Sequence, residues 1–387
     1  MPSLIKIVLP ALAAAGFAHA ECSVSATTTV QNQGDVAAMT TCATFSGSIA
    51  IATGTTEDIA LGSIKQLAGN LVAPPNSNIR RISASDLVNI TGEMNLDGLT
   101  RLNGVDFPQL KSVNSIKWNA LPNLQNIGFT AQVETAKKIV IENTAVRSLK
   151  GINIAQAEFL KIANNQFVNE IKMQLGNVSN SLDFSDNNKA VEIELTNLIW
   201  ANNLTFRSTG SILVPSLTKL NGSLTLSKNG FESFAAPNLT EVGEAIAIVG
   251  NDKMKNISFP LLTKVNDNLQ IANNSALGEV DGFPELKSIG GAFDISGNMT
   301  EVNTPKLDNV AGAFNLQSSG NISCSFFQNL KNKKLIAGKF FCSGSLENPS
   351  VAGTSPKSQN GQKGAASTLS AMTGALGLAA MAAVLLI

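Results

Sequence analysis

The sequence predicts an all-β fold in which one short strand recurs in each turn of a parallel β-solenoid. Three observations lead to this prediction. An apolar-x-apolar pair recurs about every 22 residues, a period typical of stacked structural repeats. A Pro-x-Leu-x-x-apolar phrase lies between many of the pairs. The alternation of apolar and other residues within each pair has the period of a strand, and it is too short for a helix.

The apolar pairs continue without a missing repeat through most of the chain. Their first members are 20 to 24 residues apart, which predicts about 13 rungs of about 22 residues. Because each repeat supplies one strand in the same direction, we expect a parallel ladder. The pairs are Ile49/Ile51, Leu71/Ala73, Met94/Leu96, Ile116/Trp118, Ile139/Ile141, Leu160/Ile162, Leu182/Phe184, Leu204/Phe206, Leu224/Leu226, Ile246/Ile248, Leu269/Ile271, Phe293/Ile295 and Phe314/Leu316.

The proline phrase predicts the corners between faces of the coil. Proline fixes φ and lacks a backbone donor, so it suits a corner better than a central ladder position. The Leu and the apolar residue that follow it should point inward. The prolines are Pro108, Pro122, Pro215, Pro237, Pro260, Pro284 and Pro305. Residues 128–214 lack the phrase but keep the rungs, so we interpret them as degenerate repeats of the same domain.

An asparagine follows the second apolar residue of several rungs by three positions. Asparagine tolerates tight turns and bonds nearby backbone, so this series predicts a structural ladder. Its members are Asn165, Asn187, Asn229, Asn251, Asn274 and Asn298. Asn298 is also a glycosylation acceptor, and a buried ladder position would conflict with that role.

The two ends of the chain have the composition of targeting signals. Residues 1–20 combine Lys6, an apolar run and Ala18-His19-Ala20, which predicts a signal peptide rather than a short buried helix. Residues 343–364 are predicted to form a Ser/Gly-rich linker, and 365–387 a GPI-anchor signal, with Gly364 as the attachment site and Asn360 as its rival. A tail-anchored helix is the alternative, although the apolar tail is short for one. Residues 21–342 remain for the solenoid and its caps.

The cysteines and the acceptor asparagines fit a secreted chain. Four cysteines allow three connectivities, and the local pairs Cys22–Cys42 and Cys324–Cys342 are favoured because a long stack separates the two ends. Each pair should tie down a terminal cap. Asn-x-Ser/Thr sequons, which predict N-glycosylation, begin at Asn89, Asn177, Asn203, Asn221, Asn238, Asn256, Asn273, Asn298 and Asn321.

Few residues are available for catalysis. The only histidine, His19, lies in the predicted signal peptide, which excludes histidine-dependent catalytic and metal sites from the mature chain. Glu192 and Glu194 share one side of a strand and could suggest glycoside hydrolysis, but a solvated strand face is the better interpretation. No cofactor is expected. The 28 basic and 28 acidic residues predict no basic field for nucleic acid.

The outward side chains and the two tryptophans are the candidates for a binding surface. Outward rung residues carry both signs of charge, so no uniform charged patch is expected. We expect Trp118 in the core, and Trp200 is left unassigned. The outward residues in question are Lys117, Lys161, Asp183, Asp294 and Asn315.

The repeat phrases and the terminal signals resemble a known family. Leu-x-Leu-x-x-Asn is partly similar to leucine-rich repeats, and the irregular turns resemble receptor L-domains, which are right-handed β-helical solenoids. With the cysteine pairs, sequons and anchor signal, the chain resembles the fungal GPI-anchored cell-wall organisation proteins of the extracellular-mutant and sporulation-specific family. The likeness spans residues 43–320.

This resemblance implies a non-enzymatic surface glycoprotein required for cell-wall organisation and integrity. Its implied location is the outer face of the plasma membrane, the cell wall, or both. Its implied partners are the plasma membrane, reached through the anchor, and the glucan and mannoprotein matrix. The alternative is a receptor or adhesin-like module that binds a glycan or protein ligand on a broad sheet face.

Overall fold

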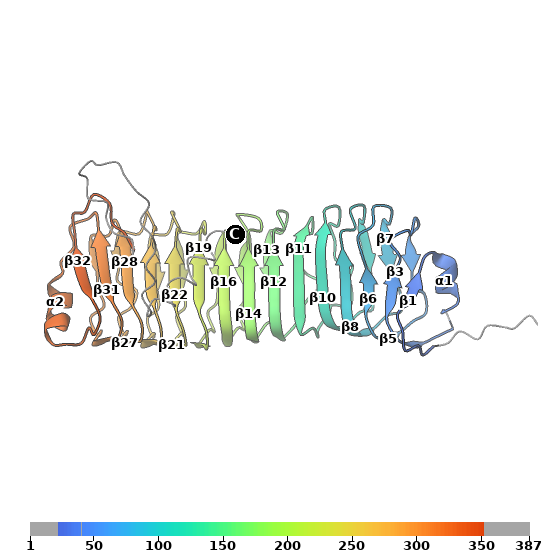
Figure 1. The fold of residues 1–387 in the computed structure, drawn as a ribbon, viewed down its shortest axis with the longest axis horizontal. Coiled ribbons are helices and arrows are strands. Elements are labelled where there is room, and N and C mark those ends of the chain that lie inside the picture. Colours follow the sequence, from blue (N-terminus) through green and yellow to red (C-terminus); the bar gives the residue numbers. More distant parts are fainter. Residues whose placement is uncertain (1–21, 40, 352–387) are drawn as a thin grey trace, which may run out of the picture. The chain divides into compact units, whose positions relative to one another are not determined.

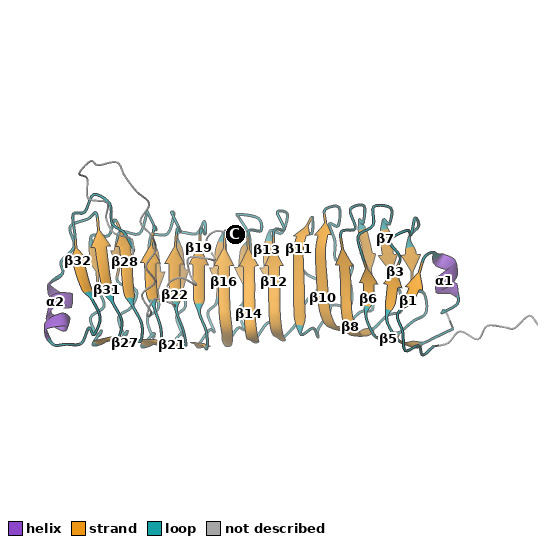
Figure 2. Ribbon diagram, viewed as in Figure 1, coloured by secondary structure: helices purple, strands orange, loops and turns teal. Residues whose placement is uncertain are grey.

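The fold is a parallel β-solenoid, as the repeat predicts. The structure, a computed structural model, describes residues 22–39 and 41–351. The predicted signal peptide and anchor signal, with Gly364 and Asn360, lie outside these residues. Figure 1 shows the strands of successive turns side by side from β1 to β32, and Figure 2 shows helices at the two ends of the stack.

The predicted rungs form the main ladder of the solenoid. All thirteen first members pair in parallel register from turn to turn, for example Ile116 with Ile139 and Leu224 with Ile246. One strand precedes them and one follows. The strands of the main ladder are β1 (Thr28–Val30), β3 (Ile49–Ile51), β6 (Leu71–Ala73), β8 (Asn89–Asp97), β10 (Ser112–Leu121), β11 (Lys138–Thr144), β12 (Gln156–Ala163), β14 (Asn177–Ser185), β16 (Trp200–Arg207), β19 (Leu224–Ser227), β22 (Ile246–Val249), β25 (Leu269–Ala272), β28 (Phe293–Gly297), β31 (Phe314–Ser318) and β32 (Phe340–Ser343).

A second ladder runs beside the main one and is continuous with it where the strands are long. The first residues of β8, β10, β12, β14 and β16 belong to it, and a register shift separates them from the rung in β10, β12 and β14. Its separate strands are β2 (Thr44–Ser46), β5 (Gln66–Ala68), β18 (Lys219–Leu220), β21 (Glu241–Val242), β24 (Lys264–Val265), β27 (Ser288–Ile289) and β30 (Asn309–Val310).

Short sheets form the third side of the coil. They are β4 (Ile59–Ala60), β7 (Arg81–Ser83) and β9 (Gly104–Asp106); β13 (Glu170–Lys172), β15 (Glu192–Glu194) and β17 (Ser211–Leu213); β20 (Ser233–Ala235) and β23 (Asn256–Ser258); β26 (Glu279–Val280) and β29 (Glu301–Val302). All of their pairings are parallel.

The core fills the centre of the coil along its length. Both apolar members of every predicted rung are buried, and so are the inward residues of the proline phrase, such as Leu239 and Val242. Phe259 and Phe283 stack with ring centroids 5.1 Å apart, and Phe293 and Phe314 with centroids 4.5 Å apart. Each buried side chain of this size contributes about 1.5–3 kcal/mol, which offsets the cost of ordering the turn.

The Asn ladder lies within this interior, and two threonines, which are not among the predicted members, belong to it as well. Its side chains are fully or almost fully buried: Thr144, Asn165, Asn187, Thr209, Asn229, Asn251 and Asn274. Both threonines also follow a rung by three residues, so the spacing could have identified them. Asn298 is not a member, because it is exposed and donates from Nδ2 to the carbonyl of Ser275 (2.8 Å).

Each end of the solenoid carries a helix and a disulfide. At the N-terminal end, Asn32 and Asp35 form a capping box on α1 (Gln33–Ala37), and Cys22 is bonded to Cys42. At the C-terminal end, α2 (Ser325–Asn332) follows Cys324, which is bonded to Cys342. Phe327 of α2 packs on Phe314 with centroids 4.9 Å apart, so this helix is joined to the core.

Candidate functional site

The outward side chains are the candidates for function, because the inward ones are occupied in stacking. In the described part of the chain, no cluster of three His, Cys, Asp or Glu side chains could hold a metal ion. No helix among the described residues is long and apolar enough to cross a membrane. The cysteines that the structure describes are all in disulfides.

The nine sequon asparagines are all accessible. Asn89, Asn177 and Asn203 are half-buried, and the other six are exposed: Asn221, Asn238, Asn256, Asn273, Asn298 and Asn321. None belongs to the buried Asn ladder. In three of them Nδ2 donates to a backbone carbonyl of the preceding turn: Asn203, Asn238 and Asn298. In these three the Nδ2 atom, to which a glycan would be attached, is thus already in contact with the backbone.

The outward side of the main ladder carries a small charged cluster at β11, β12 and β14. Lys161 Nζ lies 2.7 Å from Glu142 Oε1, and this hydrogen bond raises the pKa of Lys161. Burial raises the pKa of Asp183, which neighbours Lys161 in register, and its Oδ1 has no hydrogen-bond partner among the described residues. The cluster contains both signs of charge, as predicted, and Lys117 lies exposed on β10, the strand next to β11.

Other outward residues of the main ladder are covered rather than open. Asp294 and Asn315 are buried, and Asn315 Nδ2 donates to Asp294 Oδ1 (2.8 Å) and to the carbonyl of Ser350 (3.0 Å). The backbone N–H of Ser350 donates to Gln317 Oε1 (3.0 Å). The start of the expected linker therefore lies against β31, and this part of the sheet is not an open face.

Glu192 and Glu194 lie on β15 and point to the same side. Lys172 Nζ is 3.1 Å from Glu194 and 3.2 Å from Glu170, and hydrogen bonds to Glu194 and then Glu170 raise the pKa of Lys172. Glu192 is exposed. Glu194 belongs to a solvated ion-pair network and Glu192 is simply exposed to solvent, so the geometry adds no support for an acid–base pair.

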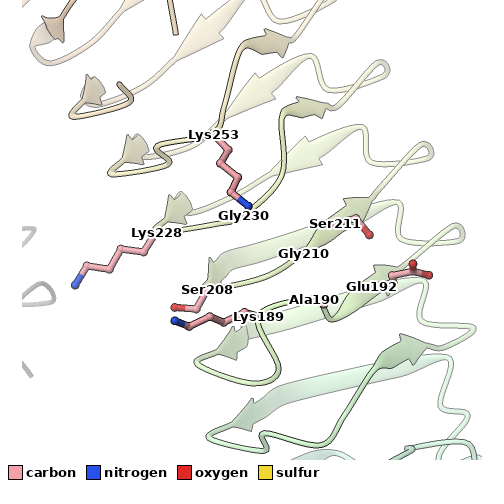
Figure 3. Close-up of a pocket in the computed structure, with 9 residues that line it drawn as sticks. All are labelled: Lys189, Ala190, Glu192, Ser208, Gly210, Ser211, Lys228, Gly230 and Lys253. Carbon is pink, nitrogen blue, oxygen red and sulfur yellow. The ribbon is translucent and has the colours of Figure 1, made fainter. Parts of the chain in front are cut away.

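A basic hollow lies beside Glu192. Its volume is about 620 Å³, and it is lined by Lys189, Ala190, Glu192, Ser208, Gly210, Ser211, Lys228, Gly230 and Lys253. Figure 3 shows Lys253 extending toward Gly230, while Lys189 lies beside Ser208 and Lys228 extends away from the strands. A Cβ at Gly210 would overlap the backbone of Ala190, so glycine keeps the turns close here. Within the described residues, none of the three lysines makes an ion pair.

A second hollow of about 620 Å³, here called the Trp200 groove, lies at the start of β12, β14 and β16. It is lined by Glu134, Thr135, Ala136, Lys137, Ala155, Gln156, Ala157, Glu158, Asn177, Ser179 and Trp200. Trp118 is fully buried against Phe129, as expected, whereas Trp200 is only half-buried. The unassigned tryptophan is therefore the one at the surface.

A family model and three similar proteins point to the same family. The family model described as "Ecm33: GPI-anchored cell wall organization protein" matches residues 3–39. "Protein ecm33" of Aspergillus fumigatus is 38% identical over 352 residues, covering 90% of this chain and 88% of that protein. "Cell surface GPI-anchored protein" of Arthroderma benhamiae is 36% identical over 366 residues, covering 94% of each. "Sporulation-specific protein 2" of Saccharomyces cerevisiae is 31% identical over 293 residues, covering 75% of this chain and 58% of that protein. No solved structure matches the chain.

Proposed function

The chain belongs to the Ecm33 family of GPI-anchored cell wall organization proteins, and on this premise we propose that it is a non-enzymatic surface glycoprotein that organises the fungal cell wall. The family model is described by cell wall organization and one relative is named for the cell surface, and the names reported above describe no enzyme. The observation that carries the proposal is the long solenoid with nine accessible sequons and an interior occupied by stacking.

The chain organisation that we propose follows the sequence signals. Residues 1–20 would direct secretion, residues 21–342 would form the solenoid with its caps, and 343–364 would lead to the anchor site. Residues 365–387 would be removed when the anchor is attached at Gly364, or at Asn360. The plasma membrane and the glucan and mannoprotein matrix would then be the partners. Mass spectrometry of wall and membrane fractions would identify the attachment residue and the occupied sequons.

Deletion of the gene tests the wall function directly. We expect the deletion strain to become more sensitive to dyes that bind wall polymers, and re-expression of the full chain to restore resistance. Re-expression of a chain that lacks residues 365–387 should fail to restore it, because the protein would be released. Unchanged dye sensitivity after deletion would contradict the proposal.

A second candidate function, a receptor or adhesin-like module, is favoured by the basic hollow of Figure 3. Its three lysines make no ion pair among the described residues and outnumber its one acidic lining residue, Glu192, which suits an anionic glycan or protein ligand. Glycan-array binding that disappears when Lys189, Lys228 and Lys253 are changed to Gln would support it. A glycan-processing enzyme would be favoured over both only by an activity that Glu192→Gln abolishes.

A further inference from the structure

The Trp200 groove contains a sequon, and this combination indicates what occupies it. Asn177 and Ser179, the first and third residues of one sequon, both line the groove together with Trp200. In the parallel ladder, Asn177 of β14 is the register partner of Trp200 of β16. The next residues, Val178 and Ala201, are fully buried, so Asn177 and Trp200 point outward together. The acceptor amide and the indole are therefore neighbours on one face.

The amide of Asn177 is available for a glycan. Unlike the amides of Asn203, Asn238 and Asn298, its Nδ2 donates no hydrogen bond among the described residues. Ser179, whose hydroxyl completes the sequon, is exposed. A bulky group on Asn177 would extend into the groove without breaking an existing contact of the amide.

The walls of the groove match the chemistry of a sugar. The faces of N-acetylglucosamine that carry C–H groups are apolar, and a flat indole offers a large apolar surface with a polar edge. Gln156, the register partner of Asn177 on the other side, supplies an amide for the sugar's hydroxyl and acetamido groups. Glu158 and Lys137 add further hydrogen-bonding groups at the rim. A volume of about 620 Å³ is sufficient for one or two sugar rings.

We propose that Asn177 carries an N-glycan whose first N-acetylglucosamine packs on the indole of Trp200 and fills the Trp200 groove. The groove then binds the chain's own glycan and is not a site for a free ligand. The proposal rests on the secretion that the proposed function requires, since N-glycans are attached on that route.

A matched control sequon lies on the same side of the coil. Asn89 opens β8 as Asn177 opens β14, both are half-buried, and both point outward from the second ladder. The register partners of Asn89 are Gln66 and Ser112, so it has no aromatic neighbour in the ladder. A glycan on Asn89 should lack the packing that we assign to the glycan on Asn177.

Acrylamide quenching of tryptophan fluorescence tests the packing, because Trp118 is fully buried and Trp200 supplies the accessible signal. The full chain is produced in a glycosylating yeast as wild type, S179A, N177Q and N89Q, and occupancy is read by mass spectrometry. We expect Asn177 to be occupied and the quenching constant to rise about twofold in S179A and N177Q, because the shielding glycan is lost. N89Q should match wild type. Trimming to a single N-acetylglucosamine should leave the protection in place.

The outcomes separate this proposal from the proposed function. An occupied Asn89 with an empty Asn177 would overturn the packing proposal and leave the surface function intact. The same holds if Asn177 is occupied but S179A quenches like wild type. If no sequon were occupied, both proposals would be overturned, because both require a chain that carries N-glycans.

Discussion

The backbone N–H of Asn229 donates to Oδ1 of Asn251, one turn along the coil, across 2.9 Å. Asn251 Nδ2 donates in turn to the carbonyl of Leu226 (3.0 Å) and to Oδ1 of Asn274 (3.0 Å). One buried amide thus joins three successive turns by hydrogen bonds. A donor or acceptor that loses its partner in such a place has no water to replace it.

Asn251→Ala should therefore be strongly destabilising. It leaves the N–H of Asn229 and the carbonyl of Leu226 without their partner, at about 1–3 kcal/mol for each buried group, so we expect a loss of about 3 kcal/mol or more. Guanidinium unfolding of unglycosylated protein measures it. Asn298→Ala is the control, since this asparagine has the same sequence spacing but is exposed, and should cost less than about 1 kcal/mol. Equal losses in the two variants would contradict a role for the ladder.

Gly128→Ala should disrupt the corner after β10. Gly128 has a φ of 64°, and a Cβ there would overlap the carbonyl oxygen of Val105 in the preceding turn. Backbone strain and the steric overlap together predict a loss of about 3 kcal/mol or more. The thermal midpoint of purified protein would report the effect. Gly54→Ala is the matched control, because nothing lies within 4 Å of a Cβ at that position; a similar loss there would refute the steric explanation.

Changing both Cys324 and Cys342 to Ser should loosen the C-terminal cap before the rest of the solenoid. The disulfide spans a sequence separation of 18 residues, for which loop entropy predicts a contribution of about 3 kcal/mol. Because repeats share stability with their neighbours, the loss should concentrate at this end. Hydrogen exchange should show α2 and β32 losing protection while β16 keeps its own. Uniform loss along the chain would argue against a local cap.

Asp183→Asn should stabilise the protein at pH 7 and have little effect below pH 3.8, the ordinary pKa of the group. Burial raises the pKa of Asp183, so the folded chain disfavours its ionised form. The protonated Asp183 side chain contributes its full stability below the ordinary pKa. That contribution is lost as the pH rises through the higher pKa that Asp183 has in the folded chain. Urea unfolding at pH 7 and pH 3 measures the change. Glu192→Gln, at an exposed position, serves as the comparison; stabilisation of equal size in both variants would exclude burial as the cause.

The sequence predicts the rungs in the middle of the fold and the disulfide-tied caps, but not the outermost strands of the main ladder, β1 and β32. Inside the stack, both members of a rung face the core, so the apolar pair is visible in every repeat. At β1, Thr28 holds the first position of the pair, opposite Ile49, so the apolar pair is not visible in the sequence there. At β32 the pair is Phe340 and Cys342, so its second member is a cysteine. The spacing from Phe314 to Phe340 is longer than between other rungs, because α2 lies between these two residues.

The Trp200 groove could not be predicted from the sequence. Asn177 and Trp200 were both visible, but their adjacency depends on the second ladder, where β14 and β16 shift register between Val178 and Ser181. Asn298 had the spacing of the Asn ladder, yet β28 continues to Gly297, so Asn298 turns outward and Met299 takes the buried place. Both outcomes depend on local strand length, which the repeat period does not specify.

The helix at each end of the stack has a consequence for how copies of the protein meet (Figure 1). A parallel ladder ends in a strand whose unpaired N–H and C=O groups can template another chain. Because α1 packs beside β1 and Phe327 of α2 packs on Phe314 at the other end, we expect the two caps to hinder such pairing between molecules. We expect a chain without its caps to associate end to end through these edges, which light scattering would detect. The caps thus limit the parallel ladder to a fixed number of turns, although each turn could in principle pair with another.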